Sequence, residues 1–194
     1  MKLLRMFSTD TYKGTPHYID SQKKYEILRT LLYFLISLSL FAAGYLTTKT
    51  KVNLLTIVAV LGCLPACKSL VNLILFLKFH SCPHETVLEL AKHSEGLTDL
   101  FDMVFTTYDK NYNIGHMVLC GNTVVCYTTQ EKFDESAFIK HLTDTMALEN
   151  MTNITFKIFY DLKKYTQRLE QLKNLEKDQK LTEAVKSTLL SVSL

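Results

Sequence analysis

The sequence predicts a membrane α-helical hairpin of two transmembrane helices, joined to a small α/β domain of the α+β kind. Apolar residues fill two blocks, Ile27–Leu46 and Val52–Leu77. Each block is long enough to cross a hydrocarbon core of about 30 Å, which takes about 20 helical residues. The remainder alternates short amphipathic helices with strands. We therefore expect a polar N-terminal segment at 1–22, the transmembrane hairpin at 23–79 and a soluble domain at 83–194.

The first apolar block has spanning length and carries a single charge, Arg29, in its first turn. Asp20 or Ser21 is the expected N-cap of this helix, because both side chains accept hydrogen bonds from free backbone N–H groups. No small-residue cleavage site follows the block, so the sequence favours an uncleaved anchor over a cleaved signal peptide.

The second apolar block contains the two candidate functional residues of the membrane part, Pro65 and Lys68. Proline removes a backbone hydrogen bond and bends a helix, and a lysine near the centre of a span costs about 2.5–3.5 kcal/mol on insertion scales. Lys68 either faces a polar partner in an oligomer, an anionic lipid headgroup or a water-lined cavity, or it lies at the interface because the span ends near Cys67. A tilted span with a snorkelling lysine is intermediate between these interpretations.

Basic residues beside the spans predict the orientation of the hairpin. Those before the first span outnumber those in the connecting loop, where only Lys49 and Lys51 occur. The bias places the amino terminus and the C-terminal domain in the cytoplasm. Two sequons begin at Asn150 and Asn153 and would be glycosylation acceptors if the domain faced a secretory lumen instead.

Composition limits the possible chemistry. The net charge of +3 is too small to indicate a nucleic-acid partner, and the five cysteines are scattered without a disulfide framework. His80, Cys82 and His84 alternate just after the second span, but a structural zinc site needs a fourth ligand and wider spacing. Pro83 at the first position of a new helix explains this stretch more simply. No metal and no cofactor are expected.

Periodicity in the soluble domain predicts the order α-β-β-β-α-β-α-α. The first helix should end at Gly96, Gly121-Asn122 makes a two-residue hairpin turn, and Asp134 and Asp161 are helix caps. The expected elements are helix His84–Ser94, strands Leu100–Thr107, Ile114–Cys120 and Thr123–Thr128, helix Glu135–Leu148, strand Asn153–Tyr160, and helices from Leu162 and from Leu181.

The hairpin turn also fixes a strand register. It pairs Cys120 with Thr123 and Met117 with Cys126, so both faces of the hairpin are apolar and the sheet should be covered on both sides. Cys120 and Cys126 then lie on opposite faces, which excludes a disulfide between them. The apolar stripe along Leu162–Leu172 is expected to pack against the sheet, with a contact between protomers as the alternative.

The element order over Glu85–Tyr160 resembles the core of the PD-(D/E)XK nuclease-like proteins. That resemblance implies a carboxylate on the second strand and a Glu-x-Lys pair on the third, which together hold a divalent metal. Here the third strand, Thr123–Thr128, contains neither acid nor base. Asp99 and Asp102 lie near the first strand without a partner that would close a metal site. The resemblance therefore implies the fold without the nuclease activity.

Other catalytic motifs are missing from the sequence: a Gly-rich phosphate loop, G-x-S-x-G and C-x-x-C. His116 and His141 are candidate bases, although a histidine on the face of an element is usually structural. We expect no catalysis, and predict a membrane-anchored interaction or assembly protein whose cytosolic domain binds a protein partner or itself. The alternatives are a degenerate nuclease-like or nucleic-acid-binding module, and a small oligomeric channel or transporter. Acidic residues interleave with the basic ones of the domain, which argues against nucleic acid.

Overall fold

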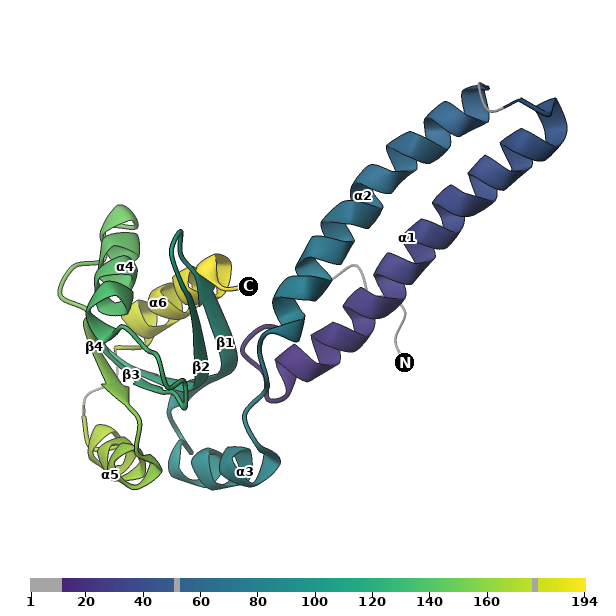
Figure 1. Ribbon diagram of the computed structural model, residues 1–194. Helices are drawn as coiled ribbons and strands as arrows, with labels where there is room; N and C mark the ends of the chain where they lie inside the picture. The colour runs from purple at the N-terminus through teal and green to yellow at the C-terminus, as the bar shows by residue number, and fades with distance from the viewer. Residues whose placement is uncertain (1–11, 51–52, 176–177) are drawn as a thin grey trace. The chain divides into compact units, whose positions relative to one another are not determined.

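The computed structural model of the chain describes residues 12–50, 53–175 and 178–194 (Figure 1). It forms two compact units, a helical hairpin within Ile19–His80 and an α/β unit that combines Ser81–Leu194 with residues 12–18. The predicted N-terminal segment thus contributes to the α/β unit. Residues 1–11 of that segment, and the predicted start of the second span at residues 51–52, lie outside the described residues.

The hairpin consists of α1, Tyr18–Thr48, and α2, Leu54–Leu77. With 31 and 24 residues these helices are about 46 and 36 Å long at 1.5 Å per residue. Both are long and apolar enough to cross a membrane. The predicted N-cap of α1 is wrong: the helix begins at Tyr18, and Asp20 lies in its first turn, where a carboxylate still interacts favourably with the helix dipole.

The α/β unit has the predicted order of elements. Helix α3, His84–His93, precedes strands β1, Thr98–Thr106, β2, Asn111–Cys120, and β3, Thr123–Tyr127; then come α4, Glu135–Leu148, β4, Thr155–Phe159, α5, Leu162–Leu172, and α6, Gln179–Val192. The strands lie in the order β1-β2-β3-β4; the first three are antiparallel neighbours, and β4 is parallel to β3. The described residues thus contain six helices and one mixed four-stranded sheet.

Helices cover both faces of this sheet, as predicted (Figure 1). Side chains of α4 and α6, including Leu142 and Leu189, pack with one face, and those of α3 and α5, including Leu90 and Leu169, pack with the other. The stripe on α5 therefore faces the sheet, and the alternative of a contact between protomers is wrong: Leu169 and Leu172 are fully buried within the unit.

The strand register is also confirmed. Cys120 pairs with Thr123 and Met117 with Cys126, and Cys120 and Cys126 belong to opposite cores. All five cysteines are free. Strands β1 and β2 begin two and three residues earlier than predicted. The added residues of β1 pair with the end of β2, as Thr98 does with Leu119, and those of β2 pair with the end of β1, as Asn111 does with Thr106. Most of these added residues are polar, so an apolar alternation pattern does not detect them.

The outer edge of β1 is occupied by segments from both ends of the chain. The amide of Phe101 donates to the carbonyl of Gly14 at 2.8 Å, and the amide of Leu194 donates to the carbonyl of Val104 at 2.9 Å. Gly14 has φ +76°, and a Cβ there would lie 2.6 Å from Leu100 Cδ2, so glycine is required at this approach. These contacts remove an open strand edge from the unit.

Candidate functional site

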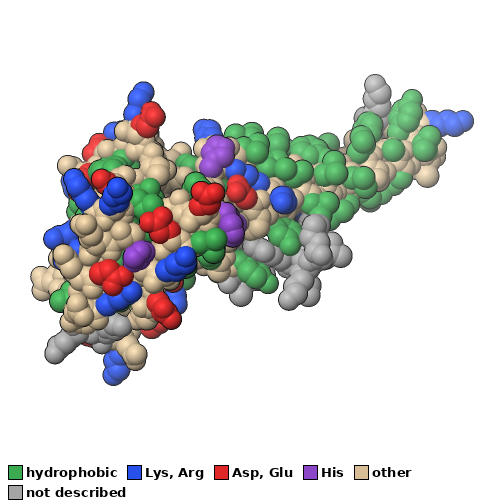
Figure 2. All heavy atoms as spheres, turned by 90° about the horizontal axis from the view of Figure 1, so that it is seen from below, with side chains coloured by type: hydrophobic (Ala, Val, Ile, Leu, Met, Phe, Trp, Pro, Cys, Tyr) green, Lys and Arg blue, Asp and Glu red, His purple; other side chains and the backbone are tan. Residues whose placement is uncertain are grey.

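The hairpin has its large apolar side chains on the outside. Among the residues that the structure describes, all but five of the exposed large hydrophobic ones lie between Ile27 and Leu77. The five exceptions, all in the α/β unit, are Leu88, Tyr108, Leu148, Tyr160 and Leu175. The face of the hairpin seen in Figure 2 is largely hydrophobic, with Lys and Arg side chains towards its two ends. This distribution is the reverse of that in a soluble helix pair, which buries its large apolar residues.

Small residues line the contact between α1 and α2. Ala59 and Ala66 are buried, and a Cβ added to Gly62 would lie 2.8 Å from Ser37 Oγ. At the loop end, a Cβ on Gly44 would lie 2.8 Å from Asn53 Oδ1. Small residues at such spacings let two helix backbones approach closely, as is typical of helix pairs in membranes.

A buried polar cluster closes the other end of this helix contact. Glu26 is 1% exposed and forms an ion pair with Arg29. Its carboxylate also accepts from Gln22 Nε2 at 3.3 Å and from Ser69 Oγ at 3.4 Å. The hydroxyls of Thr30 and Ser69 are 2.7 Å apart and join the two helices. Sequence reasoning missed Glu26, although its spacing from Gln22 and Thr30, four residues each way, places all three on one helix face.

The two predicted residues of the second span both lie on the outside of the hairpin. Helix α2 continues from Leu54 to Leu77 through Pro65. Pro65 and Lys68 are exposed, whereas the neighbouring Ala66 and Ser69 face α1 and are buried. Neither residue therefore belongs to the polar cluster between the helices.

In the α/β unit, His116 forms the centre of a second buried network. Its Nδ1 lies 2.9 Å from the hydroxyl of Tyr165 on α5, and its ring packs 4.3 Å from that of Phe101. Its Nε2 lies 3.6 Å from Asp99 Oδ2, too far for a normal hydrogen bond. Burial lowers the pKa of His116 despite the nearby Asp99 carboxylate. The imidazole is therefore a fully enclosed group that ties β2 to α5, and not an accessible base.

The two acids near the first strand also have structural partners. Burial opposes ionisation of Asp99, but interactions with His116 and with the Ser94 hydroxyl, which donates at 2.7 Å, outweigh it and lower the Asp99 pKa. Asp102 has φ +52° within β1 and accepts from the backbone amide of Cys82 at 2.8 Å. Burial, with a smaller contribution from Asp102, raises the pKa of the Cys82 thiol to about 11. This cysteine is therefore a protonated thiol and not an activated nucleophile.

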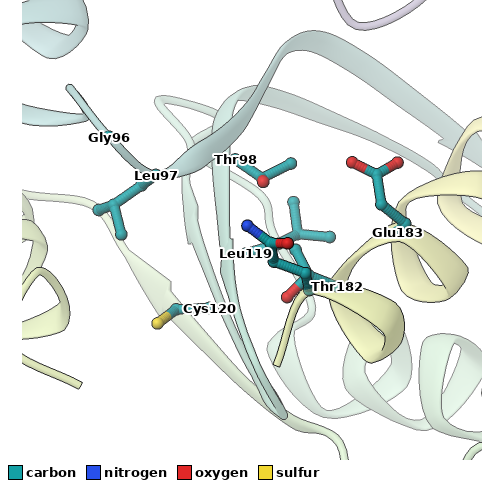
Figure 3. A pocket seen from close by; sticks show the side chains of 8 residues that line it. Gly96, Leu97, Thr98, Leu119, Cys120, Thr182 and Glu183 are labelled. Atoms are coloured by element: carbon teal, nitrogen blue, oxygen red, sulfur yellow. The ribbon is translucent and has the colours of Figure 1, made fainter. Parts of the chain in front are cut away.

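Surface hollows occur among the described residues of the α/β unit. One, of about 310 Å³, is lined by residues before β1, by the end of β2 and by α6 (Figure 3). Thr182 contributes a hydroxyl that already accepts from the amide of Gly121 and donates to the carbonyl of Asp178. The sulfur of Cys120 points away from Glu183 (Figure 3). This hollow therefore lacks a nucleophile paired with a base.

The second hollow, of about 430 Å³, lies between the β1–β2 turn and α4 and is lined by His141. Lys110 and Asp134 at its rim form an ion pair at 2.9 Å. Among the described residues there is no group of three or more histidine, cysteine or acidic side chains that could hold a metal ion. Of the alternating His80, Cys82 and His84, Cys82 is buried and His84 contacts His17 at 3.2 Å.

No protein family, no curated protein and no solved structure matches this chain. The resemblance to the nuclease-like core thus stays a prediction that rests on element order. The candidate functional features are accordingly those of the chain's own geometry: the apolar exterior of the hairpin, its buried polar cluster and the outward-facing Lys68.

Proposed function

We propose that this chain is an integral membrane protein whose helical hairpin anchors an α/β domain at the membrane surface. The domain acts there as a non-catalytic binding or assembly module for a protein partner or for a second copy of itself. The observation that carries the proposal is the apolar exterior of the hairpin. The small-residue contact between its helices supports it.

The apolar exterior of the hairpin is too large to stay in water. Removing a large aliphatic or aromatic side chain from water is worth about 1.5–3 kcal/mol. About twenty such side chains are exposed between Ile27 and Leu77, so leaving them in water would cost tens of kcal/mol. That exceeds the net stability of a typical domain, about 5–15 kcal/mol. Insertion into a bilayer would remove these side chains from water and avoid this cost.

The structural roles of its polar groups support a binding role for the domain. His116 and Asp102 are enclosed and serve the packing of the unit, and the Cys82 thiol is held protonated by burial. With a closed core on each face of the sheet, the outer surface of the domain is available for recognition of a partner. The surplus of basic residues before the first span supports a cytoplasmic location for this domain.

Membrane insertion is tested by carbonate extraction and flotation of the full-length chain with vesicles. We expect the protein to remain with the lipid after the carbonate wash. Protein that washes off and stays monodisperse in plain buffer would contradict the proposal.

Expression in a secretory system tests the orientation of the domain. Glycosylation at Asn150 or Asn153 would show that the domain faces the secretory lumen and not the cytoplasm.

Light scattering and cross-linking in detergent test the assembly role. We expect a stoichiometric oligomer or a co-purifying protein, and a strict monomer without a partner contradicts this role.

Salt-dependent DNA binding would instead favour the nucleic-acid alternative. The channel alternative requires a pore between copies, because Lys68 lies on the outside of its own hairpin. It predicts that Lys68→Leu changes conductance in reconstituted bilayers.

A further inference from the structure

Strand β4 forms one of the two edges of the sheet in the α/β unit (Figure 1). At the opposite edge, β1 bonds to Gly14 and Leu194, which come from the two ends of the chain. The inner side of β4 pairs with β3, and no described residue forms a strand pair with its outer side. Thr155 and Lys157 on β4 are exposed and Ile158 is half-buried. This edge of the sheet therefore lies at the surface of the unit.

The outer side of β4 presents backbone groups that can bond a further strand. The amide of Thr155 donates to the carbonyl of Asn122 at 2.8 Å, so Thr155 turns its backbone groups towards β3. The backbone groups of successive residues alternate between the two sides of a strand. Those of Phe156 and Ile158 therefore point away from β3, where an added strand can pair with them.

Lys157 gives this edge a positive charge on one face of the sheet. It pairs with Val125 on β3, and Val125 belongs to the core that α3 and α5 cover. Lys157 therefore lies on the α5 face of β4, with its side chain exposed. A lysine in the middle of an edge strand disfavours antiparallel pairing with an identical strand, because such pairing brings like charges together.

Helix α5 adds basic side chains along the same edge. Glu170 on α5 contacts His93 on α3 at 2.8 Å, so this flank of α5 faces α3. Arg168 lies two residues earlier, about 160° around the helix axis, and Lys164 lies one turn before Arg168. Because α3 packs over the β1 side of the sheet and α5 over the β4 side, this second flank faces the edge. The acid at the start of α5, Asp161, already accepts from backbone amides as the N-cap.

The other face of the same edge is apolar. Phe156 is buried in the core that α4 and α6 cover, and Ile154 and Ile158 are partly buried against that core. Tyr160, which directly follows β4, is 49% exposed, and its ring contacts that of Phe133. Side chains of an added strand would alternate between the two faces, so they would meet basic groups on the α5 face and apolar groups on the α4 face.

We propose that the outer edge of β4 binds an extended segment of a partner protein by strand addition, and that this segment alternates acidic and apolar residues. Its acidic side chains meet Lys157, Lys164 and Arg168, and its apolar side chains meet Ile158 and Tyr160. Main-chain hydrogen bonds supply the affinity of such a contact, and side chains at alternate positions supply its specificity. This inference rests on the proposed binding role of the domain and gives the chemical class of its partner.

The test measures binding of an eight-residue peptide of alternating glutamate and valine to the full-length protein in detergent, by fluorescence anisotropy. We expect this peptide to bind more tightly than the matched lysine–valine peptide. Lys157→Gln should weaken its binding about threefold, and Lys157→Glu about tenfold, because the second change replaces an opposite-charge pair by a like-charge pair. The matched control is Lys140→Glu on α4, at the hollow beside the β1–β2 turn, which should leave binding unchanged.

Strand addition is tested separately by methylation of the peptide nitrogens. A strand added to β4 pairs through one of its own edges, and its glutamate amides and valine amides point to opposite edges. N-methylation of one set of amides should therefore abolish binding, whereas N-methylation of the other set should preserve it. Equal affinities for the two methylated peptides would show that the peptide does not add as a strand.

Three further results would overturn the assignment: no binding of the glutamate peptide, equal binding of the lysine peptide, or an equal loss in Lys140→Glu. A disulfide between two Lys157→Cys chains through residue 157 would show that a second copy occupies the edge instead. Light scattering of the same sample separates the two proposals. An oligomer or a co-purifying partner without peptide binding refutes the edge site alone, whereas a strict monomer that binds no peptide contradicts the binding role as well.

Discussion

The ion pair of Glu26 and Arg29 gives the sharpest prediction about the hairpin. Replacing either partner by glutamine keeps the side-chain volume similar and leaves the other charge without its counter-charge. Breaking a buried pair costs about 3–5 kcal/mol. The two variants should differ, because the side chain of Glu26 is 2% exposed and that of Arg29 is 17% exposed, so water reaches the arginine that remains in Glu26→Gln better than the glutamate that remains in Arg29→Gln. We expect Arg29→Gln to destabilise the hairpin by about 4 kcal/mol and Glu26→Gln by about 2–3 kcal/mol.

The double variant Glu26→Gln/Arg29→Gln should recover part of this loss, with a coupling energy of about 1–3 kcal/mol. Cys63 provides a native probe, since it is half-buried on α2 in a groove between the helices that Ser37 also lines. Its rate of maleimide labelling, resolved by peptide mapping during an SDS titration in mild detergent, reports separation of α1 from α2.

The control is a second ion pair of the same helix, Asp20 and Lys23, which has the same spacing and a 51% exposed aspartate side chain. Asp20→Asn should change the stability of the hairpin by less than about 1 kcal/mol. Strict additivity of the Glu26 and Arg29 substitutions, or an equal effect of Asp20→Asn, would show that the buried pair does not hold the helices together.

Three further predictions concern single positions. Gly62→Leu should separate α1 from α2 and speed labelling of Cys63, because even a Cβ at Gly62 would lie 2.8 Å from Ser37 Oγ; unchanged labelling would contradict the close packing. Asp102→Ala should lower the free energy of unfolding by about 2 kcal/mol in thermal melts, since it removes the hydrogen bond that the Asp102 carboxylate accepts from the buried amide of Cys82. Asp102 has a φ of +52°, and Asp102→Asn, which can keep this hydrogen bond, should cost less than half as much. Because the pKa of His116 in the folded protein lies below its ordinary 6.5, the unfolded chain gains a proton first as the pH falls. Stability should therefore decline from about pH 6.5 downward, and His116→Phe should flatten that part of the profile in denaturant titrations.

Much of the fold was predictable because it is encoded locally. The order of the elements from α3 to α6 follows from hydrophobic periodicity, and the caps at Asp134 and Asp161 were identified from single residues. The pairing of β2 with β3 followed from the two-residue turn alone, since that turn permits one register. The start of α1 was misplaced, because Tyr18 and Ile19 extend the helix without any capping signal in the sequence.

The functional groups were less predictable, because their roles depend on partners that are distant in the chain. Asp99 and His116 are 17 residues apart and Tyr165 lies 49 residues after His116. No spacing rule joins these three side chains, and only the packing of α5 on the sheet does so. Asp102 likewise resembles a metal ligand in the sequence, but its bond to the amide of Cys82 shows a structural role.

The sequence by itself determined that two apolar helices form a hairpin and that a two-sided sheet follows, because length, hydropathy and periodicity act over a few turns of chain. Only the tertiary structure decided how each helix is rotated about its own axis. That rotation turns Glu26 and Ser69 towards the contact between the helices and Lys68 away from it. The helices approach each other closely at Gly62 and Ala66, so large side chains do not fit between them there.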